Sequence, residues 1–249
     1  MMKNLIAILI LSTVSLSVMA EGVPQLKAER GPMKIRKRQA RPDVPGHLLI
    51  EFGLNLLLND DPAIETEILG SRTLNFYYLY DFRIASSKFY FLPGIGVGLD
   101  RYKFDEDVTL ARTVDGLGEK VTTFDTISTG GIKKSMLVTN YLDIPLELRF
   151  YGNPEDQRRS FKVGVGLKVG MLMSSHTKIK MEQDGDISKL KVKDNFNLTR
   201  FRYGVTGRIG VGGFNVFYYQ NLTPLFEKDK GPNATEASNI TIGLSFTGF

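Results

Sequence analysis

Ser174, Ser175 and His176 place two hydroxyls and an imidazole side by side at the end of an apolar segment. A serine hydroxyl becomes a nucleophile when a neighbouring histidine accepts its proton, so these residues could serve a hydrolase. A single histidine at a strand end is more often an interfacial residue than a base. We therefore predict no catalytic residue and keep a lipid hydrolase only as an alternative function.

Other motifs with chemical potential are weaker still. The chain has no cysteine, which excludes disulfides and thiolate chemistry, and His47 and His176 are too far apart to form a spaced metal-binding pair. The acidic stretches 105–107 and 184–186 lack the ligand spacing of a calcium loop. The glycines of 94–98 do not have the spacing of a nucleotide loop, and no helix follows them. We predict neither a metal nor a cofactor.

Charged residues that alternate with apolar ones form the candidate site. In NYLDIPLELRF, residues 140–150, Asp143, Glu147 and Arg149 lie on one face of a strand and leucines occupy the other. Both signs of charge recur in this way in mid-strand, as a paired internal network requires. The predicted network comprises Glu51, Asp81, Arg83, Glu147, Arg149, Lys162, Lys168, Arg202 and Arg208.

A period of two runs from His47 to the end of the chain, and no amphipathic helix is evident. The segments with this period are 47–59, 72–84, 89–102, 140–150, 159–175, 201–211, 214–222 and 238–249. Pro145 has no N–H to donate, so we expect a bulge or a bound water there. The pattern predicts about eight antiparallel strands.

The connections between these strands alternate between short turns and long polar loops, of which 105–135 is the longest. Such alternation is typical of transmembrane β-barrels. A soluble barrel with its apolar face inside is the competing architecture. It would turn the many glycines and charges toward water, whereas a narrow interior needs small residues opposite long ones. We predict an all-β fold, an eight-stranded antiparallel up-and-down transmembrane β-barrel that spans 47–249.

The N-terminal region predicts export. Residues 1–20 have a short positive start, an apolar run and a small-residue cleavage site, as in a secretory signal peptide. Residues 21–46 form a basic, proline-containing arm that we place in the periplasm. The net charge of +5 comes largely from this arm, so the composition gives no nucleic-acid footprint.

Four stretches resemble a known family: RPDVPG before the first strand, FLPGIGVGL, MLVTNYLDIPLELRF and NFNLTRFRYG. They are similar to the outer-membrane β-barrel proteins of Bacteroidota, a group that includes PorT-like barrels, over residues 47–249. The resemblance implies the barrel architecture and the outer membrane, and it supplies no catalytic motif. PorT itself is linked to type IX secretion.

The function predicted from these features is non-enzymatic. A packed, charged interior is unsuited to a general porin, so binding or scaffolding through the long outer loops is expected. The alternatives are a PorT-like component of a type IX secretion apparatus and a membrane-embedded lipid hydrolase. The expected partners are outer-membrane lipid and lipopolysaccharide, together with an envelope or secretion-system protein. The oligomeric state stays open.

Overall fold

The computed structural model describes residues 46–58, 66–104, 108–127, 131–157, 159–183 and 185–247. The chain divides into two compact units, Met1–Asp43 and Val44–Phe249, and only the second contains described residues. The predicted signal peptide and nearly all of the predicted basic arm lie outside the described residues. Within those residues, no helix has the length and apolarity needed to cross a membrane.

Strands account for most of the described chain, with a single short 3₁₀ helix, η2 (Pro232–Ala234), beside them. The strands are β1 (His47–Leu58), β2 (Arg72–Leu79), β3 (Phe82–Arg83), β4 (Phe89–Lys103), β5 (Val108–Val114), β6 (Lys120–Thr126), β7 (Ile132–Tyr151), β8 (Phe161–Gln183), β9 (Asp186–Lys193), β10 (Phe201–Val211), β11 (Phe214–Asn221) and β12 (Ser238–Thr247). A strand lies at each of the eight predicted segments.

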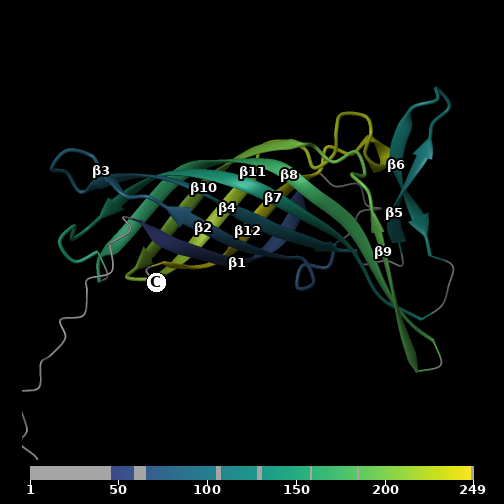
Figure 1. The fold of residues 1–249 in the computed structure, drawn as a ribbon, viewed down its shortest axis with the longest axis horizontal. Helices are drawn as coiled ribbons and strands as arrows, with labels where there is room; N and C mark the ends of the chain where they lie inside the picture. Colours follow the sequence, from purple (N-terminus) through teal and green to yellow (C-terminus); the bar gives the residue numbers. More distant parts are fainter. Residues whose placement is uncertain are drawn as a thin grey trace, which may run out of the picture. The chain divides into compact units, whose positions relative to one another are not determined.

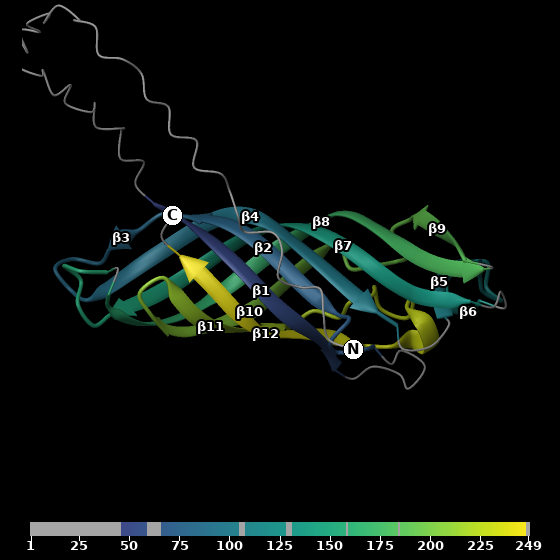
Figure 2. The same cartoon turned by 90° about the horizontal axis from the view of Figure 1, so that it is seen from below.

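All strand pairs are antiparallel, and most join neighbours in the sequence, as in an up-and-down sheet (Figures 1 and 2). The order in the large sheet is β10–β11–β12–β1–β2–β4–β7–β8–β9. The first part of β8 also pairs with β10, along Phe161–Met171, whereas its last part pairs with β9. β1 and β12, the first and last strands along the described chain, pair with each other over ten residues.

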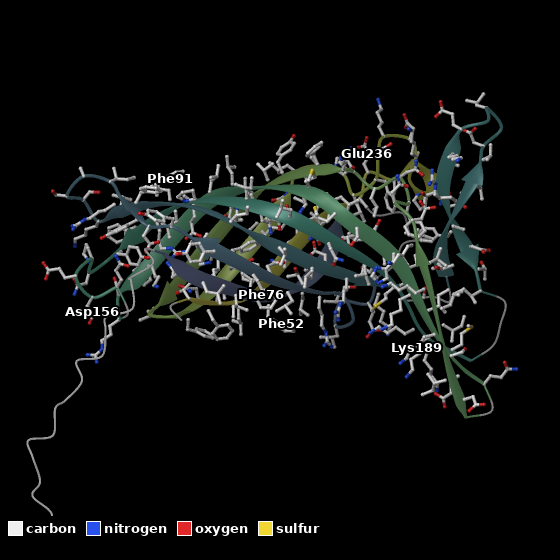
Figure 3. The ribbon with its side chains drawn as sticks, viewed as in Figure 1. Phe52, Phe76, Phe91, Asp156, Lys189 and Glu236 are labelled. Carbon is white, nitrogen blue, oxygen red and sulfur yellow. The ribbon has the colours of Figure 1, made fainter. Side chains whose placement is uncertain are left out.

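The two faces of this sheet differ in burial and in chemistry. In β2 exposed and buried residues alternate strictly, as a pleated strand requires. Large apolar side chains lie on the exposed face, including Phe52, Phe76 and Phe91, which Figure 3 shows on the outside of the ribbon. The polar and charged side chains lie on the buried face. The period of two in the sequence thus separates an apolar outer face from a polar enclosed one.

Two apolar clusters lie toward opposite ends of the enclosed face. One consists of Leu49, Tyr77, Leu79, Tyr90, Leu92 and Tyr151, near the short turns. The other joins Tyr102 and Leu137 of β4 and β7 to Val108 and Leu110 of β5 and to the segments around Leu198 and Phe226. This second cluster anchors the β5–β6 hairpin and the loops at the end of the sheet where the connections are long.

The structure corrects the sequence analysis in two places. The predicted loop 105–135 contains the β5–β6 hairpin, and β7 begins at Ile132 rather than at Asn140. β8 continues to Gln183 and turns back into β9, which the sequence analysis missed. No register shift occurs at Pro145. The ladder between β4 and β7 is interrupted there, and the irregularities in the β7–β8 pairing lie at Ile132/Lys134 and Asn140/Tyr141. A water bound at Pro145 stays a prediction.

Candidate functional site

Nine charged side chains are buried on the enclosed face, and they come from β1, β4, β7, β8 and β10. Strand alternation places them there, because each lies between two residues of the exposed face. Four are carboxylates and five are cations, so the charges nearly balance. We call this set the interior charge network: Glu51, Asp100, Asp143, Glu147, Arg149, Lys162, Lys168, Arg202 and Arg208.

One half of the network is centred on Arg202. Its Nη1 donates to Asp100 Oδ2 at 2.6 Å, and its Nη2 donates to Asp143 Oδ2 at 2.9 Å. A second bond from Nη2 reaches Asp143 Oδ1 at 3.1 Å. The guanidinium also lies 3.7 Å from the ring centroid of Tyr141, and the Tyr77 hydroxyl donates to Asp143 at 2.9 Å. Bidentate, charge-assisted bonds of this kind are among the strongest in proteins.

The other half is centred on Glu147 and is built in the same way. Arg149 Nε donates to Glu147 Oε1 at 2.6 Å, and Arg208 donates to both Glu147 and Glu51. Asn75 Nδ2 completes the set by donating to Glu51 Oε2 at 2.8 Å. Each carboxylate in this half therefore receives bonds from more than one donor.

The two buried lysines contact aromatic rings rather than carboxylates. Lys168 Nζ lies 3.6 Å from the ring centroid of Tyr219, and Lys162 Nζ lies 5.4 Å from that of Tyr151. A desolvated ammonium over a ring face is stabilised by the ring quadrupole. These contacts stabilise the two ammonium groups that have no carboxylate partner.

Glycines make room for the Arg202 half of the network. A Cβ placed on Gly98 or Gly170 would come closest to the Asp143 carboxylate and next to the Arg202 guanidinium, at 2.7 Å from Nη2 and 3.0 Å from Nε respectively. A side chain at either position would disturb the ion pair between Arg202 and Asp143. Here the small residues of the polar face are required by the bulk of the facing ion pair.

The chemistry of this network is structural. Breaking a buried ion pair by removing one partner costs about 3–5 kcal/mol, because the remaining charge stays desolvated. The bonds run between strands far apart in the sequence, such as β4 and β10, so they tie opposite parts of the sheet together. Asp143 and Arg149 are 0% and 1% exposed, so a substrate in solution does not reach their polar atoms.

Seven of the predicted site residues belong to the interior charge network, and two do not. Arg83 is exposed in the short turn that carries β3, where its Nε donates to the carbonyl of Ser87 at 3.0 Å. Asp81 is partly buried and pairs with His47 at 3.2 Å. Asp81 keeps the parity of β2, because it is partly buried between the exposed Tyr80 and Phe82. Arg83 lies beyond the end of β2 at Leu79, and for it the extrapolation of that parity was wrong.

Asp100 and Asp143 were omitted from the predicted network although both lie on the polar face. Their partner Arg202 lies 102 and 59 residues away in the sequence, and no local pattern connects them. The parity of the strands, already visible in the sequence, is the signal that could have included them.

The structure does not assemble the serine and histidine residues into a nucleophile–base pair. Ser175 points to the buried side and donates to the carbonyl of Asp194 at 2.6 Å, while Ser174 accepts a bond from Asn140 at 2.8 Å. His176 lies opposite Lys193 on the outer face. Burial and the nearby Lys191, Lys178 and Lys193 lower the pKa of His176, so the neutral imidazole predominates at pH 7, but no serine hydroxyl is bonded to it.

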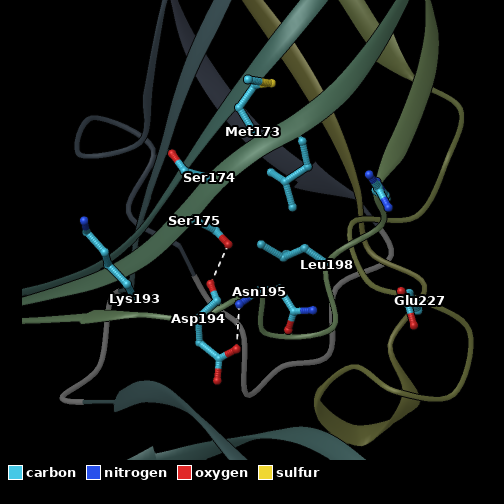
Figure 4. A pocket seen from close by; sticks show the side chains of 10 residues that line it. Met173, Ser174, Ser175, Lys193, Asp194, Asn195, Leu198 and Glu227 are labelled. Atoms are coloured by element: carbon cyan, nitrogen blue, oxygen red, sulfur yellow. Dashed lines mark hydrogen bonds between the residues drawn. The ribbon is translucent and has the colours of Figure 1, made fainter.

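A pocket of about 620 Å³ lies where β8 and β9 meet the segment 194–200 (Figure 4). Ser175, Asp194 and Asn195 line one side, and Leu172 and Leu198 line another. Asp194 accepts a bond from its neighbour Asn195 at 2.6 Å and pairs with Arg112 of β5 at 2.8 Å. Ser175 and Asn195 are thus bound to Asp194, and Asp194 is also paired with Arg112 outside the pocket lining.

No metal-binding group was found in the described part of the chain, where no three His, Asp or Glu side chains come together. The acidic stretch 105–107 and Asp184 lie outside the described residues.

The chain matches one known protein family. The family is the outer membrane protein beta-barrel domain, and the match covers residues 47–227. No curated protein matches the chain. A solved structure of Ail, the attachment invasion locus protein of Yersinia pestis, in complex with the heparin analogue sucrose octasulfate is similar at 13% identity, covering 82% of this chain and 99% of that one, with a TM-score of 0.35.

A mutant porin of Rh. blastica is similar at 8% identity and a TM-score of 0.18, covering 82% of this chain and 98% of that one. At these TM-scores neither likeness bears on function.

Proposed function

Because the chain belongs to the outer membrane protein beta-barrel domain family, we propose that it spans the outer membrane as a closed eight-stranded barrel. The barrel consists of β1, β2, β4, β7, β8, β10, β11 and β12. Two pairings support closure: β8 with β10, and β1 with β12. A closed sheet satisfies every backbone N–H and C=O between strands, which an open edge in lipid would leave unpaired.

The observation that carries this proposal is the inversion of the two faces. Phe52, Val165 and Leu244 are large apolar residues and 39–58% exposed, while Arg149 and Asp143 are buried. A soluble barrel would bury the apolar face, so the exposed one suits lipid. The turns at one end of the sheet are short and the connections at the other end are long, which supports a location of the β5–β6 hairpin outside the cell.

We propose a binding or scaffolding role rather than transport or catalysis. The interior is filled by the interior charge network between two apolar clusters, and filled eight-stranded barrels leave no aqueous channel. The β5–β6 hairpin is held against the barrel by Val108 and Leu110, whereas Leu117 at its tip is 90% exposed. A loop positioned by a rigid scaffold in this way suits contact with a partner protein.

Membrane insertion is tested by fractionation and by migration in detergent gels. The unboiled chain is expected to co-fractionate with the outer membrane and to migrate differently from the boiled chain, since a closed barrel resists unfolding in detergent. Equal migration of both samples together with a soluble chain would contradict the proposal.

The partner is tested by a photo-crosslinking residue in place of Leu117 in whole cells. A discrete crosslinked neighbour is expected there and none with the same residue at Ile84, which is exposed in the short turn at the other end. Crosslinks of equal pattern at both positions would contradict a role for the hairpin.

A PorT-like role in type IX secretion and a Bacteroidota origin stay predictions based on the sequence resemblance. A deletion strain that loses secreted cargo would favour the secretion role. The lipid-hydrolase alternative is disfavoured because Ser175 and His176 lie on opposite faces of β8 and the Ser174 hydroxyl is bonded to Asn140. Lipid turnover that disappears in His176→Ala would restore it.

A further inference from the structure

Above the apolar band, the outer face of the sheet becomes densely basic. In β4 the outward residue after Leu99 is Arg101, and in β2 the outward residue that precedes Leu74 is Arg72. Arg72 and Arg101 lie directly opposite each other across the β2–β4 pair. The change from leucine to arginine takes place within one step along each strand, or about 7 Å.

The basic face continues over the extension of β7, β8 and β9. Directly opposite residues of an antiparallel pair lie on the same face, so the registers identify its members. Lys178 is opposite Lys191, Lys180 is opposite both Lys134 and Lys189, and Lys193 is opposite His176. We call Lys134, Lys178, Lys180, Lys189, Lys191 and Lys193 the cationic array; Figure 3 shows Lys189 on this extension.

The cationic array lies on the outer face and not on the enclosed one. Lys134 has the same parity as Leu142 of the apolar band, and β7 is continuous between them. Thr177 and Ile179, which alternate with the lysines of β8, are buried. Met136 and Val138 share the outer face but are only 4% and 9% exposed, as expected where long cationic side chains lie across them.

Folding alone does not account for such an arrangement. Like charges directly opposite in a sheet are destabilising, and the cationic array contains three such pairs. Three carboxylates of this region pair with cations outside the array: Glu67 with Lys103, Asp194 with Arg112, and Glu182 with Lys133 at 3.7 Å. None of the six lysines forms a salt bridge within the described part of the chain.

The mutual repulsion also shows in the titration of a member. The pKa of Lys134 is lowered, first by burial and then by Lys103, Lys178, Arg101 and Arg72. The groups that face it are thus predominantly positive, and an anion bound there would relieve the repulsion.

We propose that the cationic array binds the phosphate groups of lipopolysaccharide in the outer leaflet. Lysine ammonium groups bind phosphate as point charges. Strand separation and the rise per residue place neighbouring cations about 5 and 7 Å apart, which lets several act on one phosphorylated headgroup. Lys193 of the array is in register with Arg101, across Val138 and His176. Arg101 is the outward residue next to the lipid-facing Leu99, a level where the headgroups of neighbouring lipids lie.

The direction in which the ends of β7, β8 and β9 extend favours a lipid over a soluble polyanion as the ligand of the cationic array. Figure 1 shows β9 and the adjoining ends of β7 and β8 diverging from the body of the sheet. Because this extension bends away from the axis of the barrel, its outer face is turned toward the membrane surface. This inference rests on the transmembrane orientation proposed above.

The test measures binding of bisphosphorylated lipid A to the purified full chain folded in an uncharged detergent. We expect Lys178→Gln/Lys180→Gln/Lys191→Gln to bind on the order of a hundredfold more weakly, because a lysine near an anionic lipid surface contributes roughly fivefold. The matched control Lys120→Gln/Lys228→Gln/Lys230→Gln removes the same charge in the long connections at the same end of the barrel. It should bind lipid A as the wild type does.

Two further probes identify the source of the phosphate or sulfate. Dephosphorylated lipid A should bind weakly to the wild type, and dextran sulfate, a soluble polyanion, should bind less tightly than lipid A. Equal binding of lipid A by the array variant and the wild type overturns the inference, and so does tighter binding of dextran sulfate. Fractionation separates this failure from that of the proposed function: a chain that inserts in the membrane yet ignores lipid A contradicts only the inference.

Discussion

On the enclosed face, Arg202 bonds to both Asp100 and Asp143, whereas on the outer face Lys178 lies directly opposite Lys191. The interior charge network is desolvated, and each arginine in it meets a carboxylate. The cationic array is solvated, and its cations meet each other. Charges paired across strands hold a fold together, whereas charges left unpaired in a rigid array are suited to a ligand of opposite sign.

The largest effect is expected from breaking the network at Arg202. Arg202→Met leaves Asp100 and Asp143 buried without a counter-ion, so the free energy of unfolding should fall by about 3–5 kcal/mol. Urea titration of the folded chain in lipid vesicles, followed by far-UV circular dichroism, measures this. A variant that also carries Asp100→Asn and Asp143→Asn should recover part of the loss. A loss below about 1 kcal/mol for the single substitution would contradict the pairing.

A smaller loss is expected from filling the space that the network occupies. Gly170→Val places a side chain against Arg202 and should cost about 1–3 kcal/mol by overpacking. Gly207→Val is the matched control within the barrel wall, since a Cβ at Gly207 has no atom within 4 Å. The control should change the unfolding free energy by less than about 0.5 kcal/mol, and equal losses in the two variants would refute the close approach.

In the cationic array, a substitution is expected to raise the free energy of unfolding rather than lower it. Lys191→Glu replaces a like-charge pair with an attractive one, so the free energy of unfolding should rise by about 0.2–1 kcal/mol. The same urea titration detects it, and Lys191→Gln should give a smaller rise. A clear loss of stability in both variants would mean that the array supports the fold.

The smallest effect concerns pH. The folded state lowers the pKa of His176, so between that pKa and about 6.5 the unfolded state binds more protons and stability rises with pH. Below this window the full penalty of protonating His176 applies. His176→Gln should therefore lose slightly less stability than the wild type between pH 8 and pH 5, by under about 0.5 kcal/mol, because exposed charges are screened. An equal or larger acid loss in His176→Gln would contradict the repulsion.

Sequence alone predicted the strands well where one face is apolar. Residues 72–79 and 161–171 alternate without interruption, and burial follows the same parity in the structure. It failed where the outer face turns basic. In 176–181 the outward residues His176, Lys178 and Lys180 carry no apolar signal, so the predicted strand ended at Ser175 and the extension of β8 was missed.

The network was harder to complete than the strands. Parity identifies which charges share the enclosed face, but which of them meet depends on the register between distant strands. Arg202 and Asp100 belong to β10 and β4, which do not pair with each other. Arg83 was wrongly included for the opposite reason: β2 ends at Leu79, and Arg83 in β3 no longer lies on the face that the parity of β2 assigns to it.

The most direct test of the account compares Leu244→Cys and Ser245→Cys, neighbours in β12 that are 39% and 0% exposed. The chain has no cysteine of its own, so each variant carries a single label site. In vesicles, a fluorophore on Cys at 244 should be quenched by brominated lipid tails, and a thiol at 245 should resist labelling by water-soluble and lipid-soluble reagents. Ready labelling of 244 by a water-soluble reagent without quenching by lipid would contradict the lipid-facing apolar side and the enclosed charged one.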